Sequence, residues 1–182
     1  MRIFKTSLLT LSAAILLTVL PAIALADTKA NDTQLAKKVR HELVMLPYYG
    51  VFDNLAYKIN GGTVTLYGQV VRSTTRSSAE RVVKKLPGVA QVVNNIKVLP
   101  LSRFDDQTRV AVYRSIARTG GLYRYLQGGN PSLHIIVDHG RVALEGVVAT
   151  SGDKTLATFA ANRVSGTFGV TNNLRVESEE AK

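Results

Sequence analysis

The chain has 182 residues, a net charge of +10 at neutral pH and no cysteine. The lack of cysteine excludes disulfides, a thiolate metal site and a lipid-anchored cysteine, so the fold depends on its hydrophobic core. The positive charge favours anionic partners such as lipid headgroups, acidic glycans or nucleic acid, with a merely soluble basic protein as the alternative.

The first 26 residues have the features of a secretory signal peptide. Arg2 and Lys5 precede the apolar run LLTLSAAILLTVL, and the small-residue sequence ALA follows at 24–26. The run is short for a transmembrane helix, so we predict cleavage after Ala26 and export to the periplasm, or secretion if the source has no outer membrane. Cleavage removes two of the 23 basic residues and no acid, which leaves a net charge of about +8. Export makes nucleic acid the least favoured partner.

Residues 31–99 have the pattern of a helix, two strands, a helix and a strand. DTQLAKKVRHEL (32–43) predicts the first helix, and LAYKI (55–59) predicts the first strand. Apolar residues alternate along GTVTLYGQV (62–70), and the glycine turn before it predicts an antiparallel hairpin. The spacing of the next apolar residues predicts an amphipathic helix: Ala79, Val82, Val83 and Leu86. VVNNIKV (92–98) predicts the last strand.

The same pattern returns 78 residues later, which indicates a duplication. GRVALEGVV (140–148) repeats GTVTLYGQV, and VTNNLRV (170–176) repeats VVNNIKV. We predict a second domain over residues 104–177 and a disordered tail over 178–182. A strand–helix–strand crossover is nearly always parallel, so the third strand of each domain should run parallel to the second, beside the antiparallel hairpin. We therefore predict the fold class α+β. Each of the two tandem α-β-β-α-β domains has a three-stranded mixed sheet with two helices on one face.

The glycine turn, the Val-x-Leu-x-Gly strand, a Gly-Val pair and the Val-x-Asn strand together resemble the BON domain, named for bacterial OsmY and nodulation. Six glycines carry the motif: Gly62, Gly68, Gly88, Gly140, Gly146 and Gly166. Gly68 and Gly146 interrupt their strands, which indicates a bulge or the close approach of a helix. The second copy departs from the motif at Thr167 and Phe168, where the first has Val89 and Ala90.

The resemblance implies a module without enzymatic activity that binds phospholipid surfaces and supports the cell envelope. Two copies behind a signal peptide resemble the osmotically inducible periplasmic proteins of this family. The resemblance implies no cofactor and no small-molecule substrate.

The residues themselves offer no catalytic or metal-binding arrangement. His41 is expected on a solvated helix face, His134 on a strand facing solvent, and His139 in a hairpin turn. No two of them share a metal-ligand spacing, so we predict no metal site. No Gly-x-Ser-x-Gly elbow or phosphate-binding glycine loop is present.

Tyrosine and basic residues form the candidate binding surface, because a tyrosine ring and a cation together suit the lipid–water interface. In the second domain these residues are Arg114, Arg118, Tyr123, Arg124 and Tyr125. In the first domain they are Lys37, Lys38, Arg40, Lys84 and Lys85. The alternatives are loop residues that only anchor the fold and charges that only confer solubility. The sequence leaves open which domain makes the contact.

With the resemblance and the predicted signal peptide taken together, we expect a non-enzymatic periplasmic protein of the envelope-stress response that binds anionic phospholipid. The alternative is a protein–protein adaptor, since the edges of three-stranded sheets can pair with a partner's strand, or a chaperone in envelope assembly.

Overall fold

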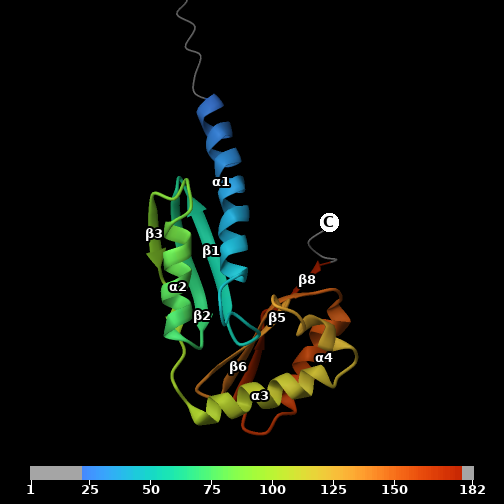
Figure 1. Cartoon of the computed structure of the whole chain (residues 1–182). Coiled ribbons are helices and arrows are strands. Elements are labelled where there is room, and N and C mark those ends of the chain that lie inside the picture. Colours follow the sequence, from blue (N-terminus) through green and yellow to red (C-terminus); the bar gives the residue numbers. More distant parts are fainter. Residues whose placement is uncertain (1–21, 178–182) are drawn as a thin grey trace, which may run out of the picture.

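The computed structural model describes residues 22–177 and the side chains from residue 31 onward. Two similar α/β units follow one another along the chain (Figure 1). Residues 1–21, which hold most of the predicted signal peptide, and the predicted tail at 178–182 lie outside the described residues. The first helix begins at Ala22 and so runs through the predicted cleavage site.

The first domain has the predicted order of elements. They are α1 (Ala22–Val44), β1 (Asn54–Asn60), β2 (Thr63–Val70), α2 (Ser73–Lys84), β3 (Gln91–Asn94) and β4 (Lys97–Val98). The second domain repeats this order with one addition, a short 3₁₀ helix in the loop after its first helix. Its elements are α3 (Arg103–Ala117), η1 (Leu122–Tyr125), β5 (Leu133–Asp138), β6 (Arg141–Val148), α4 (Ser151–Asn162), β7 (Gly169–Asn172) and β8 (Arg175–Val176).

Both sheets are mixed, which confirms the predicted fold class. In the first domain β2 pairs with β1 antiparallel and with β3 parallel, and the second domain pairs its strands in the same way. Each sheet has a short fourth strand, β4 or β8, because the predicted third strand is interrupted. The Asn94 side chain accepts a hydrogen bond from the Ile96 N–H at 3.2 Å, so the backbone turns before β4 resumes the pairing with β2. Asn172 and Leu174 repeat this turn at 2.9 Å.

The two helices of each domain pack on one face of its sheet and enclose the core (Figure 1). The alternating positions Val64, Leu66 and Val70 are fully buried, and their counterparts in β6 are equally covered. Alternation along the strands and helical spacing along α2 therefore select the core.

No helix approaches Gly68 or Gly146 closely, so the second of the two explanations, a bulge or a close helix, is wrong. A Cβ atom on Gly68 would lie 2.0 Å from the carbonyl oxygen of Asn54, and one on Gly146 would lie 2.1 Å from that of Ser132. Both glycines also have φ angles above +110°. The close neighbour is the backbone at the start of the hairpin partner strand, so each glycine lets the hairpin close.

The domains dock through the loop that precedes β1. The Val51 carbonyl accepts a hydrogen bond from the Ile135 N–H of β5 at 2.7 Å, and Val51 and Phe52 pack against the core of the second domain. Lys97 and Asp138 form an ion pair across the same junction. His134 is only 7 % exposed, so the prediction that it faces solvent is wrong. Its Nδ1 lies 3.3 Å from the Gly50 carbonyl oxygen, because the first domain covers this part of the sheet.

Candidate functional site

The basic side chains predicted for the first domain are exposed, but they lie in three different places. Lys84 borders a shallow hollow on α2, Lys38 lies beside the glycine turn between β1 and β2, and Arg40 lines a groove between the domains. Lys37 is exposed on α1, and Lys85 follows the end of α2. These cations therefore do not converge on one site.

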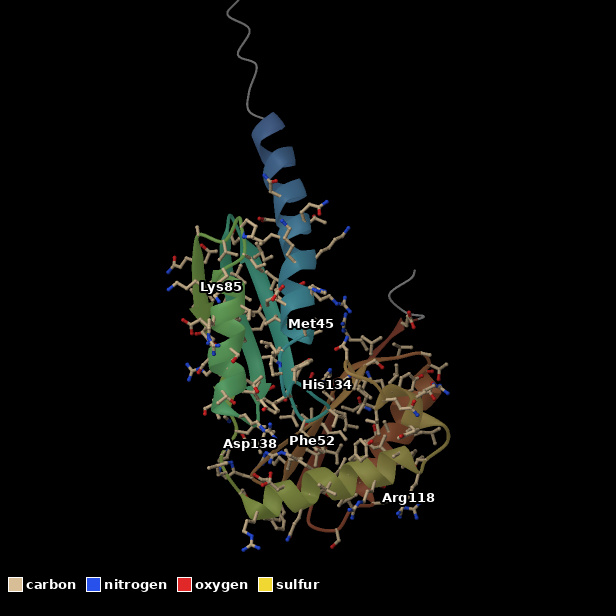
Figure 2. All side chains as sticks on the ribbon, in the orientation of Figure 1. Met45, Phe52, Lys85, Arg118, His134 and Asp138 are labelled. Atoms are coloured by element: carbon tan, nitrogen blue, oxygen red, sulfur yellow. The ribbon has the colours of Figure 1, made fainter. Side chains whose placement is uncertain are left out.

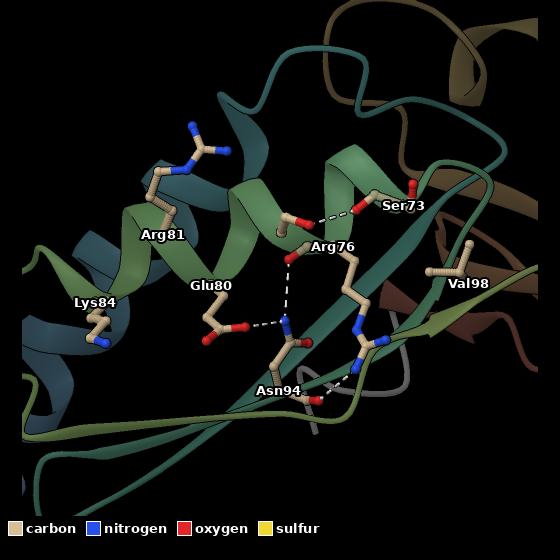
Figure 3. Close-up of a pocket in the computed structure, with 8 residues that line it drawn as sticks. Ser73, Arg76, Glu80, Arg81, Lys84, Asn94 and Val98 are labelled. Carbon is tan, nitrogen blue, oxygen red and sulfur yellow. Dashed lines mark hydrogen bonds between the residues drawn. The ribbon is translucent and has the colours of Figure 1, made fainter.

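The hollow on α2 is about 500 Å³ in volume and is lined mostly by residues with polar or charged side chains (Figure 3). Asn94 on β3 donates hydrogen bonds to the Glu80 carboxylate at 2.9 Å and to the Arg76 carbonyl oxygen at 3.2 Å. Arg76 donates to the Asn94 carbonyl oxygen at 3.5 Å. Asn172 makes the corresponding bonds to α4, at 2.8 Å to the Lys154 carbonyl oxygen and 2.6 Å to Thr158. The asparagine of the Val-x-Asn strand thus hydrogen-bonds β3 to α2 in the first domain and β7 to α4 in the second.

In the second domain, η1 divides the predicted tyrosine–arginine cluster. Tyr123 is exposed, but Tyr125 is only 8 % exposed and lies in the core. The Tyr125 hydroxyl donates to Asp153 and accepts from the Ala149 N–H, both at 2.9 Å. A lipid contact by Tyr125 does not fit this burial, because its ring and its hydroxyl are both occupied inside the domain.

Arg124 is also engaged by Asp153, which the sequence analysis did not single out. One guanidinium nitrogen of Arg124 lies 2.9 Å from the Asp153 carboxylate and 2.9 Å from the Tyr125 hydroxyl. A hydrogen bond from the Thr150 hydroxyl, with smaller contributions from Tyr125 and Arg124, lowers the pKa of Asp153. Thr150 also caps α4 by accepting the Asp153 N–H at 3.1 Å. The sequence signal was the Thr-x-x-Asp spacing at the start of the helix.

An aromatic tip, which we define as Leu101, Phe104 and Phe168, projects from the end of the second domain where α3 begins. These side chains are 96 %, 45 % and 76 % exposed. The two phenyl rings are stacked, with their centroids 5.9 Å apart. Leaving such side chains in water forgoes favourable burial, and exposed apolar side chains in contact with each other, as the two rings are, are typical of an interaction surface.

The two phenyl rings of the tip pack against two motif glycines. A Cβ atom on Gly140 would lie 2.7 Å from the Phe168 ring, and one on Gly166 would lie 3.2 Å from the Phe104 ring. In the first domain Ala90 takes the place of Phe168, and an open hollow lies beside Gly62 and Gly88. The sequence signal for the tip was the departure from the family motif at Thr167 and Phe168.

The outer face of α3 continues from the aromatic tip with exposed cationic and apolar side chains. Arg103 adjoins Phe104 at its start, Val110 is exposed in its middle, and Arg114 lies further along. Arg118 follows the end of the helix and points outward (Figure 2). The acidic Asp106 on this helix is paired with Arg109 at 2.5 Å. The structure thus places the predicted Arg114 and Arg118 on the helix that bears Phe104.

The part of the chain that the structure describes contains no group of three or more histidine, aspartate or glutamate side chains able to hold a metal ion. None of its helices combines the length and the apolar character needed to cross a bilayer.

Comparison with known proteins identifies the two repeats. The family model described as the BON domain matches residues 31–100 and again residues 104–178. No curated protein matches the chain. Two solved structures of CdsD, a structural protein of the type III secretion system of Chlamydia trachomatis, are 14 % identical with a TM-score of 0.29. The match covers 78 % of this chain and 96 % of the CdsD carboxy-terminal domain in one structure, and 81 % and 95 % in the other. With two tandem matches that span most of its length, the chain belongs to the BON domain family, whose domains are non-catalytic.

Proposed function

We propose that the protein binds anionic phospholipid surfaces through the second domain, with the aromatic tip and the outer face of α3 as the contact. The observation that carries the proposal is the exposed stacked pair Phe104–Phe168 beside an arginine-bearing helix face. The family supports it, since BON domains are associated with phospholipid membranes. The predicted signal peptide adds the proposal that the membrane belongs to the cell envelope and that the protein acts there under stress, without catalysis.

The physical chemistry of the surface supports reversible attachment rather than insertion. Full burial of a Phe or Leu side chain contributes about 1.5–3 kcal/mol, and Phe104 and Phe168 are partly covered already. A cation near an anionic membrane surface contributes about 1 kcal/mol, which salt screens. Arg103, Arg114 and Arg118 therefore attract the protein to anionic headgroups, while the tip reaches the headgroup and acyl boundary.

Flotation with vesicles tests the proposal directly. The purified protein is mixed with phosphatidylglycerol or with phosphatidylcholine vesicles at low and at moderate salt, and the vesicles are then floated. We expect the protein to float only with the anionic vesicles and to be released by salt. Protein that stays at the bottom in every condition contradicts the proposal and favours the adaptor or chaperone alternative.

A double variant localises the contact. Phe104→Ser with Phe168→Ser removes the two rings, and we expect the affinity for phosphatidylglycerol vesicles to fall by about tenfold or more. Tyr48→Ser is the matched control, because Tyr48 is an exposed aromatic residue of the first domain, 72 % exposed. Equal losses in the two variants contradict the assignment to the second domain.

A further inference from the structure

A groove of about 430 Å³ lies between the two domains, away from the aromatic tip. One wall is the carboxy-terminal half of α1 with Arg40 and Val44, and residues 54–57 of β1 lie beside it. The second domain contributes the opposite wall, including Val147 and Arg175. The groove is thus bordered by a strand, apolar side chains and an arginine from each domain.

β1 presents unused backbone hydrogen-bonding groups to this groove. It is an edge strand, paired only with β2. Tyr57 lies opposite Leu66, whose carbonyl oxygen is taken by the Asn95 N–H on the far side of β2 at 2.8 Å. Because successive residues of a strand direct their backbone groups to opposite edges, the N–H and C=O of Tyr57 point away from β2. Within residues 22–177 no backbone hydrogen bond to either group is found.

The corresponding edge of the second domain is occupied. Ile135 of β5 is the counterpart of Tyr57, and its outward N–H donates to the Val51 carbonyl oxygen at 2.7 Å. On the same edge the Val137 carbonyl accepts a hydrogen bond from Arg109 at 2.7 Å. The turn at residues 50–53 thus already supplies one backbone carbonyl to this edge in the second domain, whereas Tyr57 of the first domain has no such partner among the described residues.

We propose that the groove binds a short extended acidic segment of a partner protein, which adds to β1 as a further strand. The open part of the edge is at Tyr57, since the Leu55 backbone is already hydrogen-bonded to the Tyr49 hydroxyl. A short strand can therefore pair with β1 through the Tyr57 N–H and C=O. The exposed Arg40 favours carboxylate side chains, since opposite charges across an interface steer and orient a partner.

The test uses the full protein and three labelled five-residue peptides, with binding followed by fluorescence anisotropy at low salt. The first alternates valine and glutamate, the second has lysine for glutamate, and the third is the acidic peptide with N-methylated valines. We expect the acidic peptide to bind with a Kd below about 1 mM and the other two at least about tenfold more weakly. Absent binding, or equal binding of all three, overturns the proposal.

Two matched variants and one amide locate the site. Arg40→Glu should weaken binding of the acidic peptide about tenfold, whereas Lys37→Glu, the same charge change on α1 outside the groove, should weaken it less than about twofold. The Tyr57 amide should become protected from hydrogen exchange when the peptide is added. Binding that leaves the Tyr57 amide unchanged overturns the proposal, as does a dimer that protects it without peptide.

This inference stands apart from the proposed lipid contact. Arg40→Glu should float with phosphatidylglycerol vesicles like the unmodified protein, and the variant with both Phe104→Ser and Phe168→Ser should bind the acidic peptide normally. Loss of both activities in either variant indicates a damaged fold and is checked by circular dichroism. Loss of peptide binding in the phenylalanine variant with an intact fold overturns the assignment to the groove.

Discussion

The hairpin backbone requires glycine at positions 68 and 146 for structural reasons, and neither residue belongs to a binding site. Each has a φ angle that side-chain-bearing residues rarely adopt, and each leaves no room for a Cβ atom beside the partner strand. The neighbour is backbone, which cannot move aside as a flexible side chain can. The cost of a substitution is therefore steric at both positions.

We predict that Gly68→Ala or Gly146→Ala lowers the free energy of unfolding by more than about 2 kcal/mol, through backbone strain and overpacking together. Gly129→Ala is the control, because Gly129 has no atom within 4 Å of the added Cβ and no positive φ. Urea unfolding monitored by circular dichroism gives the comparison. A loss of stability below about 0.5 kcal/mol for Gly68→Ala contradicts the steric account.

His134 makes the junction between the domains sensitive to pH. Burial lowers its pKa from the ordinary value of 6.5, and hydrogen bonds to the Gly50 and Asp53 backbone oppose this only in part. Its ring also lies beside the Tyr49 ring, with the centroids 5.7 Å apart. Burial raises the pKa of the Asp53 carboxyl group in the same loop. The histidine is therefore neutral in the folded protein over a range where the unfolded chain is protonated.

The sign of the effect follows from proton binding. Below pH 6.5 the unfolded chain binds a proton at this position and the folded protein does not, so the free energy of unfolding falls as pH drops toward the folded pKa. We expect this fall in urea titrations between pH 7.5 and pH 5, and we expect His134→Gln to reduce its slope. Asp53 has a raised pKa, so above pH 3.8 its titration raises the free energy of unfolding as the pH drops, opposite to the effect of His134. Comparison with His134→Gln separates the two contributions. His41→Gln, at an exposed position, should keep the slope.

At the scale of elements, α3 combines exposed apolar and cationic side chains, whereas the described parts of α1 and α2 carry exposed cations without a large exposed apolar side chain. We predict that Arg114→Glu with Arg118→Glu abolishes most flotation with phosphatidylglycerol vesicles at low salt, because two attractions become repulsions. Lys84→Glu with Lys85→Glu makes the same change in charge on the first domain and should reduce flotation much less. A larger loss from the lysine variant assigns the contact to α2 instead.

Periodicity was sufficient to predict the helices and strands, because alternation and helical spacing reflect burial directly. It did not reveal η1, which follows the left-handed Gly121 and is held by backbone hydrogen bonds. It also did not reveal the break between β3 and β4, which depends on the hydrogen bond from the Ile96 N–H to the Asn94 side chain. Tyr123, Arg124 and Tyr125 are adjacent in sequence but have different environments. Only the fold shows that Tyr125 points inward to Asp153. Phe104 and Phe168 are 64 residues apart, so their contact could not be predicted from spacing.

On the scale of the whole molecule, the loop before β1 couples the two domains. Val51 and Phe52 pack on the second domain's core, with the Phe52 and Tyr113 rings 6.2 Å apart. Because small domains bury limited apolar surface, this docking contributes to the stability of both.

We predict that Phe52→Ser loosens the junction without unfolding either sheet. The Ile135 amide, whose hydrogen bond crosses the junction, should exchange with solvent much faster, while the Leu66 and Leu144 amides at the centres of β2 and β6 remain protected. Hydrogen exchange followed by NMR distinguishes these amides. Uniformly faster exchange across both sheets contradicts a local role for the loop.

The docking contact between the domains is asymmetric, because only the loop before β1 carries the apolar residues that make it. The residues that correspond to Val51 and Phe52 in the second domain are Gly129 and Asn130, which are exposed and carry no apolar side chain to bury in a neighbour. The second domain therefore receives this contact but has no means of passing it on. Repeating this contact from one copy to the next would need an apolar pair at these two positions, so the contact as built joins one pair of domains.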